Sequence, residues 1–378
     1  MLSGIKNFIK REPVLFAALL LALLSVSIIR PGFSVCLQAI DFRTLAILFS
    51  LMIVIKAFQS QNFLDFIAAR LLRLCKTKRS LYFLLTYLVF FSSMFVTNDV
   101  ALLTFVPITL LIFKRIELPA LHIVVLETLA ANLGSCITPM GNPQNLYLFS
   151  YYGFAALEFF ALTAKIAIPS LFILAVIILI LTRKNTSFSG NVLQTQSAPL
   201  KMDFRTPFYF LAFVVSLLAV FHVLNYLIML VVTLVVIVLC NWRLFKKVDY
   251  SLLLTFVGFF IFTKTLSTVP AFSDFIKSVL SSHLKTYITG IAASQVISNV
   301  PAALLLSGFT ENGAMLLLAV NVGGLGTLIA SMASVISFKL YNADVVSTGS
   351  TTGHNYFAVF TAYNFLLLAV LGVIVYII

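Results

Sequence analysis

The stretch from Ala131 to Asn145, ANLGSCITPMGNPQN, interrupts an apolar region with two prolines, two glycines and several amide side chains. An unbroken buried helix does not tolerate this combination, because proline removes a backbone donor and glycine weakens the helix. At membrane depth, irregular backbone survives only where it is buried in protein or lines a polar cavity. The stretch therefore predicts a discontinuous transmembrane helix whose break offers backbone and amide oxygens to a solute.

The composition of the chain indicates a membrane protein. Of its 378 residues, 61% are hydrophobic and only 10% are charged, which is typical of a polytopic protein with many spanning helices. The 25 basic residues outnumber the 12 acidic ones, but they cluster in short loops between apolar runs. This pattern indicates positive-inside topology rather than nucleic-acid binding. The four cysteines have neither metal-ligand spacing nor a disulfide framework, and no cofactor is expected.

The N-terminal apolar run, Val14 to Ile29, follows several basic residues as a signal peptide would. No small-residue cleavage site comes after it, so we expect a retained first helix. The N-terminus is then cytoplasmic, in a multi-pass protein of a bacterial-type inner (plasma) membrane.

Two apolar pairs have polar centres. The first runs from Leu81 to Phe113, with arms of about 16 residues joined at Thr97-Asn98-Asp99 and basic residues at both ends. The second runs from Leu284 to Leu306, with Ser298-Asn299 at its centre. Arms shorter than the roughly 20 residues of a full span predict re-entrant helical hairpins with polar tips.

A second stretch, VNVGGLGTLIASMASV from Val320 to Val335, matches the first break without gaps when Asn321 is aligned with Asn132. Its small and polar positions then coincide with those of the first break. The matched pairs are Gly134 with Gly323, Thr138 with Thr327, Asn142 with Ser331, and Asn145 with Ser334.

The flanking segments match as well. Asp41 and Asp249 each open an apolar run, and a lysine follows each of them fifteen residues later, at Lys56 and Lys264. We expect these two lysines to snorkel to opposite membrane faces.

The order of these features predicts an internal repeat. Residues 1–182 form the first half and residues 226–378 the second, with a cytoplasmic linker and one connecting helix between them at 183–225. Because of the one connecting helix, the chain crosses the membrane an odd number of times before the second half begins. The second half is therefore inverted in the membrane relative to the first. The expected fold is an all-α polytopic membrane protein with two inverted repeats, re-entrant hairpins and discontinuous helices, as in secondary transporters.

Three segments carry a family resemblance: VTNDVALLTFVPITLLI from Val96, NLGSCITPMGNPQN from Asn132 and SNVPAALL from Ser298. They resemble the ion transporter superfamily, which includes arsenite permeases, NhaD-type sodium/proton antiporters, divalent anion/sodium symporters and citrate-transporter-like membrane proteins. The Asn-Asp tip is most similar to the arsenite-permease and NhaD-like branches. The resemblance implies a homodimer, with a scaffold and a transport domain that moves as an elevator. It also implies one site formed by both tips and both breaks.

The candidate ligands for substrate and ion are amide and hydroxyl side chains of the tips and breaks, because these groups both donate and accept hydrogen bonds. The alternative for each residue is that it caps a short helix or bonds across packed helices. The candidates are Thr97, Asn98, Asp99, Asn132, Ser135, Thr138, Asn142, Asn145, Ser298, Asn299, Asn321, Thr327, Ser331 and Ser334.

Two carboxylates are expected to couple transport to an ion. An acidic group inside a membrane is costly and by default functional, so Asp99 is expected to hold Na⁺ together with Asn98 and Asn132, or to take up a proton. Its alternative role is to cap the second hairpin arm. Glu127 is the second coupling candidate, and its alternative is a buried pair with a lysine.

These features predict a secondary active transporter for a small anionic or oxyanion-like solute, coupled to H⁺ or Na⁺, with lipid and solute as its partners. A Na⁺/H⁺ antiporter that uses Asp99 and Glu127 is the alternative. A membrane-embedded enzyme is less favoured, since the chain has no HExxH motif and no Ser/His pairing in corresponding spans. A channel is less favoured because inverted broken helices form a closed central site better than a continuous pore.

Overall fold

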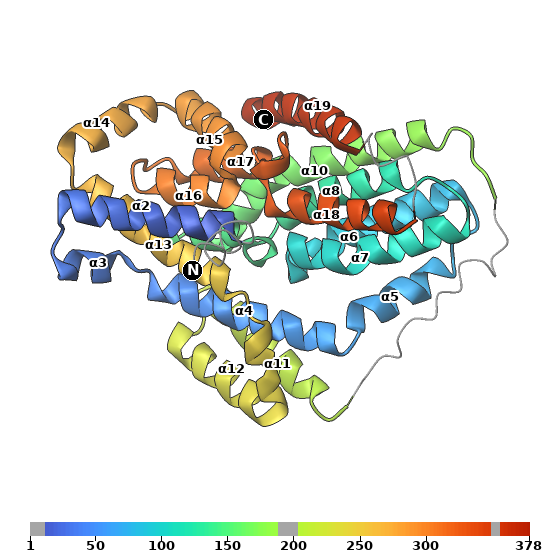
Figure 1. Ribbon diagram of the computed structural model, residues 1–378, viewed down its shortest axis with the longest axis horizontal. Helices are drawn as coiled ribbons and strands as arrows, with labels where there is room; N and C mark the ends of the chain where they lie inside the picture. The colour runs from blue at the N-terminus through green and yellow to red at the C-terminus, as the bar shows by residue number, and fades with distance from the viewer. Residues whose placement is uncertain (1–11, 188–202, 349–355) are drawn as a thin grey trace.

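The computed structural model describes residues 12–187, 203–348 and 356–378, and these residues form an all-α protein (Figure 1). Six described helices are long and apolar enough to span a membrane, which confirms the polytopic membrane fold. Those six segments are Phe42–Ser60, Lys78–Val96, Ala156–Leu181, Tyr226–Lys247, Tyr250–Ser267 and Tyr356–Ile377. The predicted cytoplasmic N-terminus and the middle of the predicted linker, 188–202, lie outside the described residues.

Each of the two predicted hairpins turns at a single residue. Helices α6 (Lys78–Val96) and α7 (Asn98–Arg115) meet at Thr97, and α15 (His283–Ile297) and α16 (Asn299–Ser307) meet at Ser298. Thr97 has φ 71° and ψ 153°, and Ser298 has φ 76° and ψ 153°. Positive φ is uncommon for residues with a side chain, so the same unusual corner at matched positions supports the predicted repeat.

The first hairpin differs in detail from its sequence prediction. Asn98 and Asp99 lie in the first turn of α7 rather than in a loop, and the arms have 19 and 18 residues instead of about 16. The first arm begins early because Thr77 and Ser80 form a capping box ahead of the apolar run.

Both predicted helix breaks are present. The first separates α8 (Leu121–Ser135) from α9 (Pro143–Tyr152), and the second separates α17 (Gly313–Val322) from α18 (Met332–Thr348). A short 3-10 turn lies in each, Pro139–Gly141 and Leu328–Ala330.

Glycine allows the first break to fold tightly. A Cβ atom at Gly134 would lie 2.1 Å from the carbonyl oxygen of Phe90, and one at Gly141 would lie 2.1 Å from that of Ser135. Both contacts are with backbone, which cannot rotate away as a side chain can. A larger residue at either position therefore cannot fit without displacing a helix.

The helices after the breaks are exchanged between the two halves of the chain. Helix α18 packs against α7 and α8 of the first half (Figure 1). Helix α9 packs against α16 and α17 of the second half. The hairpins and broken helices therefore form one interlocked unit, which we call the hairpin unit (α6–α9 and α15–α18).

A second set of helices lies beside the hairpin unit. Helix α2 (Pro13–Ile29) packs along α13 (Tyr250–Ser267), and α4 (Phe42–Ser60) packs against α11 (Thr206–Val220) and α12 (Tyr226–Asn241). We call these five helices the outer set, and Figure 1 shows α11 and α12 at its edge.

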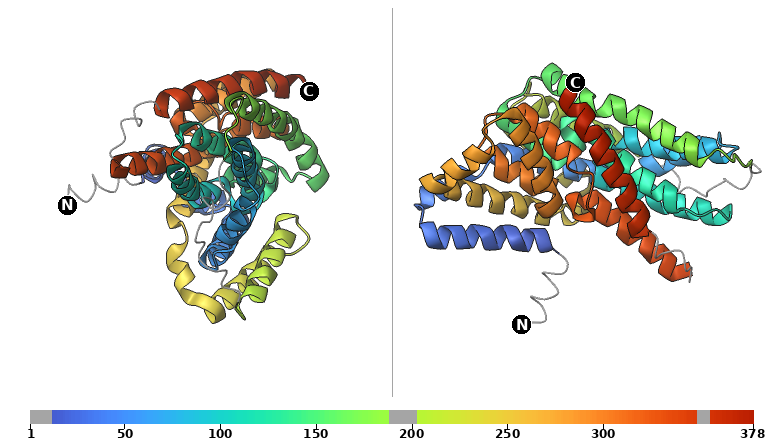
Figure 2. Two further views of the ribbon diagram at one scale, coloured as in Figure 1. Left: turned by 90° about the vertical axis from the view of Figure 1, so that its right-hand side faces the viewer. Right: turned by 90° about the horizontal axis from the view of Figure 1, so that it is seen from above.

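The remaining long helices and three short ones complete the fold. Helices α10 (Ala156–Leu181) and α19 (Tyr356–Ile377) pack against α8 and against each other, and Figure 2 shows them running along one face. The short helices are α3 (Phe33–Ala39), α5 (Phe63–Leu72) and α14 (Pro270–Val279).

Candidate functional site

Asn132 and Asn321, the two asparagines aligned from the sequence, each accept a hydrogen bond from the opposite half of the chain. Ser331 donates from Oγ to Oδ1 of Asn132 at 2.9 Å. Asn142 donates from Nδ2 to Oδ1 of Asn321 at 3.2 Å. Since Asn142 and Ser331 are themselves a matched pair, the two bonds are equivalent under the predicted repeat.

The same two asparagines also donate to a second matched pair. The amide of Asn321 donates from Nδ2 to Oδ1 of Asn145 at 2.7 Å, and that of Asn132 donates to Oγ of Ser334 at 3.4 Å. All of these side chains are buried. The two breaks are therefore joined by a reciprocal network of buried amides and hydroxyls, which we call the amide cluster (Asn132, Asn142, Asn145, Asn321, Ser331 and Ser334).

Two of these residues also have the structural role that the sequence left open as an alternative. Asn142 caps α9, because its Oδ1 accepts from the backbone nitrogen of Asn145 at 2.9 Å. The side chain of Asn145 donates to the carbonyl oxygens of Ser135, Cys136 and Thr138 inside the break. Both residues thus hold the broken backbone in shape while contacting the opposite half.

Each hairpin tip contacts the break of its own half, and the first tip also bonds to the amide cluster. Asn98, in the first turn of α7, donates from Nδ2 to Oδ1 of Asn132 at 3.2 Å. Ser298 donates to the carbonyl oxygen of Ala330 at 3.3 Å. Asn299 packs closely on Gly324. A Cβ atom added at Gly324 would lie 2.9 Å from Nδ2 of Asn299. Each tip therefore lies beside the break of its own half, and the amide cluster joins the two breaks.

Asp99 does not cap the second hairpin arm, so that alternative is wrong. The residue at the helix cap is Thr97, and the side chain of Asn98 accepts from the backbone nitrogen of Asp99 at 3.0 Å. The Oδ1 atom of Asp99 is buried and has no hydrogen-bond partner among the described residues. A buried carboxylate oxygen without a partner is expensive, so this atom is available to a cation.

The two matched threonines make equivalent bonds to the hairpins. Thr138 donates to the carbonyl oxygen of Met94 at 2.5 Å, and Thr327 donates to that of Gln295 at 3.0 Å. Met94 and Gln295 each lie three residues before the corner of their hairpin, so the threonines hold the breaks against equivalent turns.

Gln295 is a structural residue that the sequence prediction missed. Its Nε2 donates to the carbonyl oxygens of Gly323 and Leu325 at 2.8 and 3.0 Å, and its Oε1 accepts from the backbone nitrogen of Thr327 at 2.8 Å. These bonds hold the second break, which has no asparagine at the position matching Asn145. The available signal was that Gln295 is the one amide side chain in this hairpin arm.

Glu127 lies apart from the hairpin tips. It is fully buried in α8, and its Oε1 accepts a hydrogen bond from Thr109 of α7. Its Oε2 has no partner, and the described residues give it no lysine. The buried lysine pair considered from the sequence is therefore wrong.

A cavity of about 180 Å³ opens beside the first tip. Its wall includes Thr97 and Asp99 of the tip and Asn142 of the amide cluster, together with Lys56 of α4 and Asp249 at the start of α13. The rest of the wall is apolar and comes from α4, α7, α9, α13 and α18. The hairpin unit thus presents its polar tip to charged residues of the outer set.

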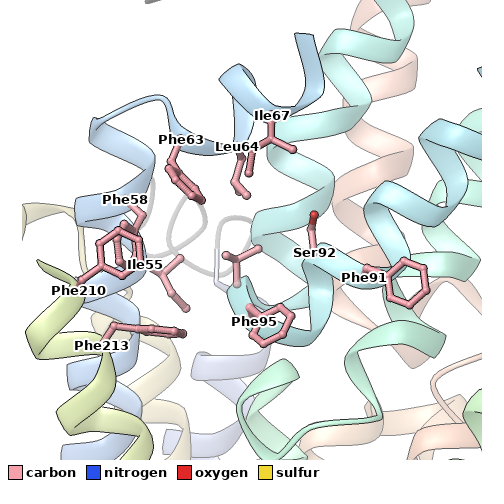
Figure 3. Close-up of a pocket in the computed structure, with 11 residues that line it drawn as sticks. Ile55, Phe58, Phe63, Leu64, Ile67, Phe91, Ser92, Phe95, Phe210 and Phe213 are labelled. Carbon is pink, nitrogen blue, oxygen red and sulfur yellow. The ribbon is translucent and has the colours of Figure 1, made fainter. Parts of the chain in front are cut away.

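A second cavity, of about 340 Å³, is apolar and has a different character. It lies between α4, α5 and α11 on one side and α6 on the other, and phenylalanine side chains face it from both sides (Figure 3). Ser92 supplies the one hydroxyl in its wall. This cavity offers no ligand for an ion, as expected for phenylalanines that provide apolar bulk.

The fold and the site define an all-helical membrane protein with paired helical hairpins and paired broken helices around a polar centre. A family model described as citrate transporter matches residues 8–312. The chain belongs to this citrate transporter family, and so it is a membrane transport protein.

Relatives over most of the chain agree with this assignment. An uncharacterized transporter of Methanocaldococcus jannaschii is 34% identical over 335 residues, which cover 88% of this chain and 90% of the relative. An inner membrane protein of Escherichia coli, YbiR, is 31% identical over 309 residues, covering 80% of this chain and 81% of the relative. The P protein of Mus musculus is 30% identical over 131 residues, but these cover only 34% of this chain and 16% of that protein.

Proposed function

We propose that the protein is a secondary active transporter of a small carboxylate anion, coupled to Na⁺ or H⁺. The observation that carries the proposal is the hydrogen bonding of the two helix breaks to each other in the amide cluster, with each hairpin tip bonded to its own break and the unpartnered Oδ1 of Asp99 at the first tip. This arrangement combines hydrogen-bond donors for an anion with one acidic oxygen for a coupling cation.

The anion is proposed to bind through dipoles and amides. Neither the tips nor the breaks contain a lysine or an arginine. Helices α7, α9, α16 and α18 all begin at the site, and helix N-termini favour negative charge. The family description makes citrate and smaller carboxylates the first anions to test.

The coupling cation is proposed to bind at Asp99. A carboxylate beside an anion site repels the substrate unless a cation neutralises it. Binding of Na⁺ or H⁺ at Asp99 therefore favours binding of the anion, and the two move together. Asn98 and Asn132 lie next to this position and are the proposed additional ligands.

Alternating access is proposed to follow from movement of the hairpin unit along the outer set, in a homodimer. The apolar cavity between α4, α5, α11 and α6 supports this movement, because a surface with a single hydroxyl slides without losing hydrogen bonds. The interlocked breaks support movement of the hairpin unit as one body.

Uptake into proteoliposomes tests the proposal. Radiolabelled citrate and smaller carboxylates would be supplied under an inward Na⁺ gradient, an inward H⁺ gradient or neither. We expect saturable uptake that one gradient stimulates, and Asp99→Asn should abolish this stimulation. Asp203→Asn is the matched control, because Asp203 pairs with Arg205 at the protein surface. Gradient-stimulated uptake that survives in Asp99→Asn would disprove the coupling role.

Na⁺/H⁺ antiport is the second candidate, and the second buried carboxylate favours it. Oε2 of Glu127, like Oδ1 of Asp99, is buried without a described partner. The same proteoliposomes, loaded with a pH-sensitive dye and given a Na⁺ gradient without any carboxylate, separate the two functions. A lumenal pH change that is lost in both Asp99→Asn and Glu127→Gln would establish the antiporter.

A further inference from the structure

At each end of the α4–α13 pair, a lysine of one helix and the aspartate cap of the other line the same cavity. Lys56, late in α4, shares the cavity of about 180 Å³ with Asp249, the residue that caps α13. Lys264, late in α13, shares a cavity of about 230 Å³ with Asp41, the residue that caps α4. The two helices therefore run antiparallel, and each lysine faces the cap of the other helix.

The two caps have the same local structure. Asp41 has φ −82° and ψ 87°, and Asp249 has φ −80° and ψ 84°. Each accepts a 3.0 Å hydrogen bond from a backbone nitrogen three residues later. One carboxylate oxygen of each aspartate is thus engaged with the helix N-terminus, where the helix dipole favours its negative charge.

The two ends differ in a third charge. The cavity with Lys56 and Asp249 also contains Asp99 from the hairpin unit. The position that matches Asp99 in the second hairpin is Val300, and the cavity with Lys264 and Asp41 contains no residue of the second tip. Lys56 therefore has a carboxylate on the hairpin unit and another on the outer set, whereas Lys264 has only Asp41.

Lys56 is paired with neither carboxylate in this structure. Its ammonium donates to Oε1 of Gln59 at 3.0 Å, and the described residues show no ion pair between it and Asp99 or Asp249. The charges of Lys56, Asp99 and Asp249 are nonetheless close enough to interact electrostatically. The positive charge of Lys247 also acts on Lys56. A lysine side chain has a long flexible stem, so its ammonium has two acceptors within one cavity.

We propose that Lys56 is an internal counter-ion for Asp99, and that Na⁺ displaces the Lys56 ammonium from Asp99 toward Asp249. Without Na⁺, the ammonium neutralises Asp99 and holds the first hairpin tip against α4. When Na⁺ binds Asp99, the ammonium moves to Asp249, and the hairpin unit is released from the outer set. This inference rests on the coupling role proposed for Asp99.

The mechanism predicts opposite effects for substitutions at Lys56 and at Asp249. Lys56→Gln removes the competitor, so the Na⁺ concentration at half-saturation should fall about tenfold, as expected for losing one nearby like charge in a partly buried site. Asp249→Asn removes the alternative acceptor and leaves Lys56 on Asp99, so the Na⁺ midpoint should rise. Asparagine is a good helix cap, so α13 should still begin at the same residue.

The double variant separates competition from a simple field effect. If Asp249 acts only through its own charge, Asp249→Asn raises the midpoint by the same factor with or without Lys56. If it acts by accepting the ammonium, the effect of Asp249→Asn largely disappears in the Lys56→Gln background. Lys264→Gln and Asp41→Asn are the matched controls at the opposite ends of the helices, and both should leave the Na⁺ midpoint unchanged.

The readout is Na⁺-dependent thermal stabilisation of the purified full-length protein at fixed pH, which requires no anion and no transport. Opposite shifts in the single variants, with loss of the Asp249 effect in the double variant, are the expected result. Independent effects, or equal shifts in the two control variants, would overturn the counter-ion role. Absence of any Na⁺-dependent stabilisation in the wild type would also overturn it, whereas H⁺-driven carboxylate uptake by that same protein would leave the proposed function standing.

Discussion

Asn142 donates a hydrogen bond from Nδ2 to Oδ1 of Asn321, 3.2 Å away, although the two residues lie 179 positions apart in the chain. The bond links the cap of α9 to the end of α17. Its equivalent, from Ser331 to Asn132, links the start of α18 to α8. A substitution at one break therefore removes a hydrogen bond from a side chain of the other.

Alanine at either central asparagine should weaken both stability and anion binding. Asn132→Ala and Asn321→Ala each leave buried partners without a hydrogen bond, at a cost of about 1–3 kcal/mol. Both variants should also bind the proposed carboxylate more weakly, since the proposed site is formed by both halves. Thermal unfolding and substrate titration measure the two effects.

The control for these asparagines is Asn364→Ala in α19. Asn364 is buried and donates to the carbonyl oxygen of Phe360 within its own helix, and no described hydrogen bond joins it to either break. Its loss should lower stability without changing substrate affinity. Equal loss of substrate affinity in this variant, or loss in only one of the two central variants, would contradict a shared site.

A methyl group at either glycine of the first break should prevent correct packing. Gly134→Ala and Gly141→Ala each place a Cβ atom 2.1 Å from a backbone oxygen, and overpacking of this kind costs about 1–3 kcal/mol or more. Gly372→Ala is the matched control, because a Cβ atom there meets nothing within 4 Å. The thermal midpoints of the purified variants should separate the first two from the third.

Methionine in place of Gln295 should destabilise the second break. The first hairpin has Met94 at the equivalent position, so the substitution fits the sequence pattern of the repeat. In this structure, however, it removes the acceptor of the Thr327 backbone nitrogen and the donor to two carbonyl oxygens. We expect a loss of about 1–3 kcal/mol, measured by denaturant or thermal unfolding. Wild-type stability in Gln295→Met would show that water replaces these bonds.

The loop between α11 and α12 should make stability depend on pH. Partial burial and the adjacent Arg43 lower the pKa of His222, and the Arg43 guanidinium donates to Nδ1 of the neutral ring. The unfolded chain then binds more protons than the folded protein just below the ordinary histidine pKa of about 6.5. The contribution of His222 is therefore complete above that pH and is lost as the pH falls below it.

Thermal midpoints measured between pH 5 and 8 test this dependence against His222→Gln. Glutamine can still accept from Arg43 but does not titrate, so the part of the pH dependence due to His222 should disappear. An identical pH profile for wild type and variant would assign the dependence to other groups.

The breaks and tips could be predicted because the sequence violates the rules of a buried helix there. Proline and glycine around Asn142, and polar tips between apolar arms, survive inside a membrane only where protein or a polar cavity surrounds them. The alignment of Asn132 with Asn321 was informative for the same reason, and the reciprocal hydrogen bonds fall on the pairs that it matched. The inverted repeat itself stays a prediction that these bonds support.

Other features depend on packing that no local pattern encodes. The short helices α3 and α14 lie in short segments between spans, where composition alone did not distinguish helix from loop. To predict that Lys56 and Asp99 share a cavity, one would have to know how α4 crosses α13 and where the hairpin unit lies. Snorkelling was expected for Lys56 because its helix could be seen in the sequence, whereas its neighbours in space could not.

The exchange of α9 and α18 between the halves has a consequence for biosynthesis. When the ribosome has completed the first half, Asn142 and Asn145 are already within the membrane, but their acceptor and donor on Asn321 have not yet been made. The hydrogen bonds of the first break to Asn321 therefore cannot form until nearly the whole chain has been translated. Until then the side chains of this break are solvated or held by an insertion factor. A nascent chain truncated before Asn321 should accordingly be a preferred target of membrane proteases, even though every helix of its own half is present.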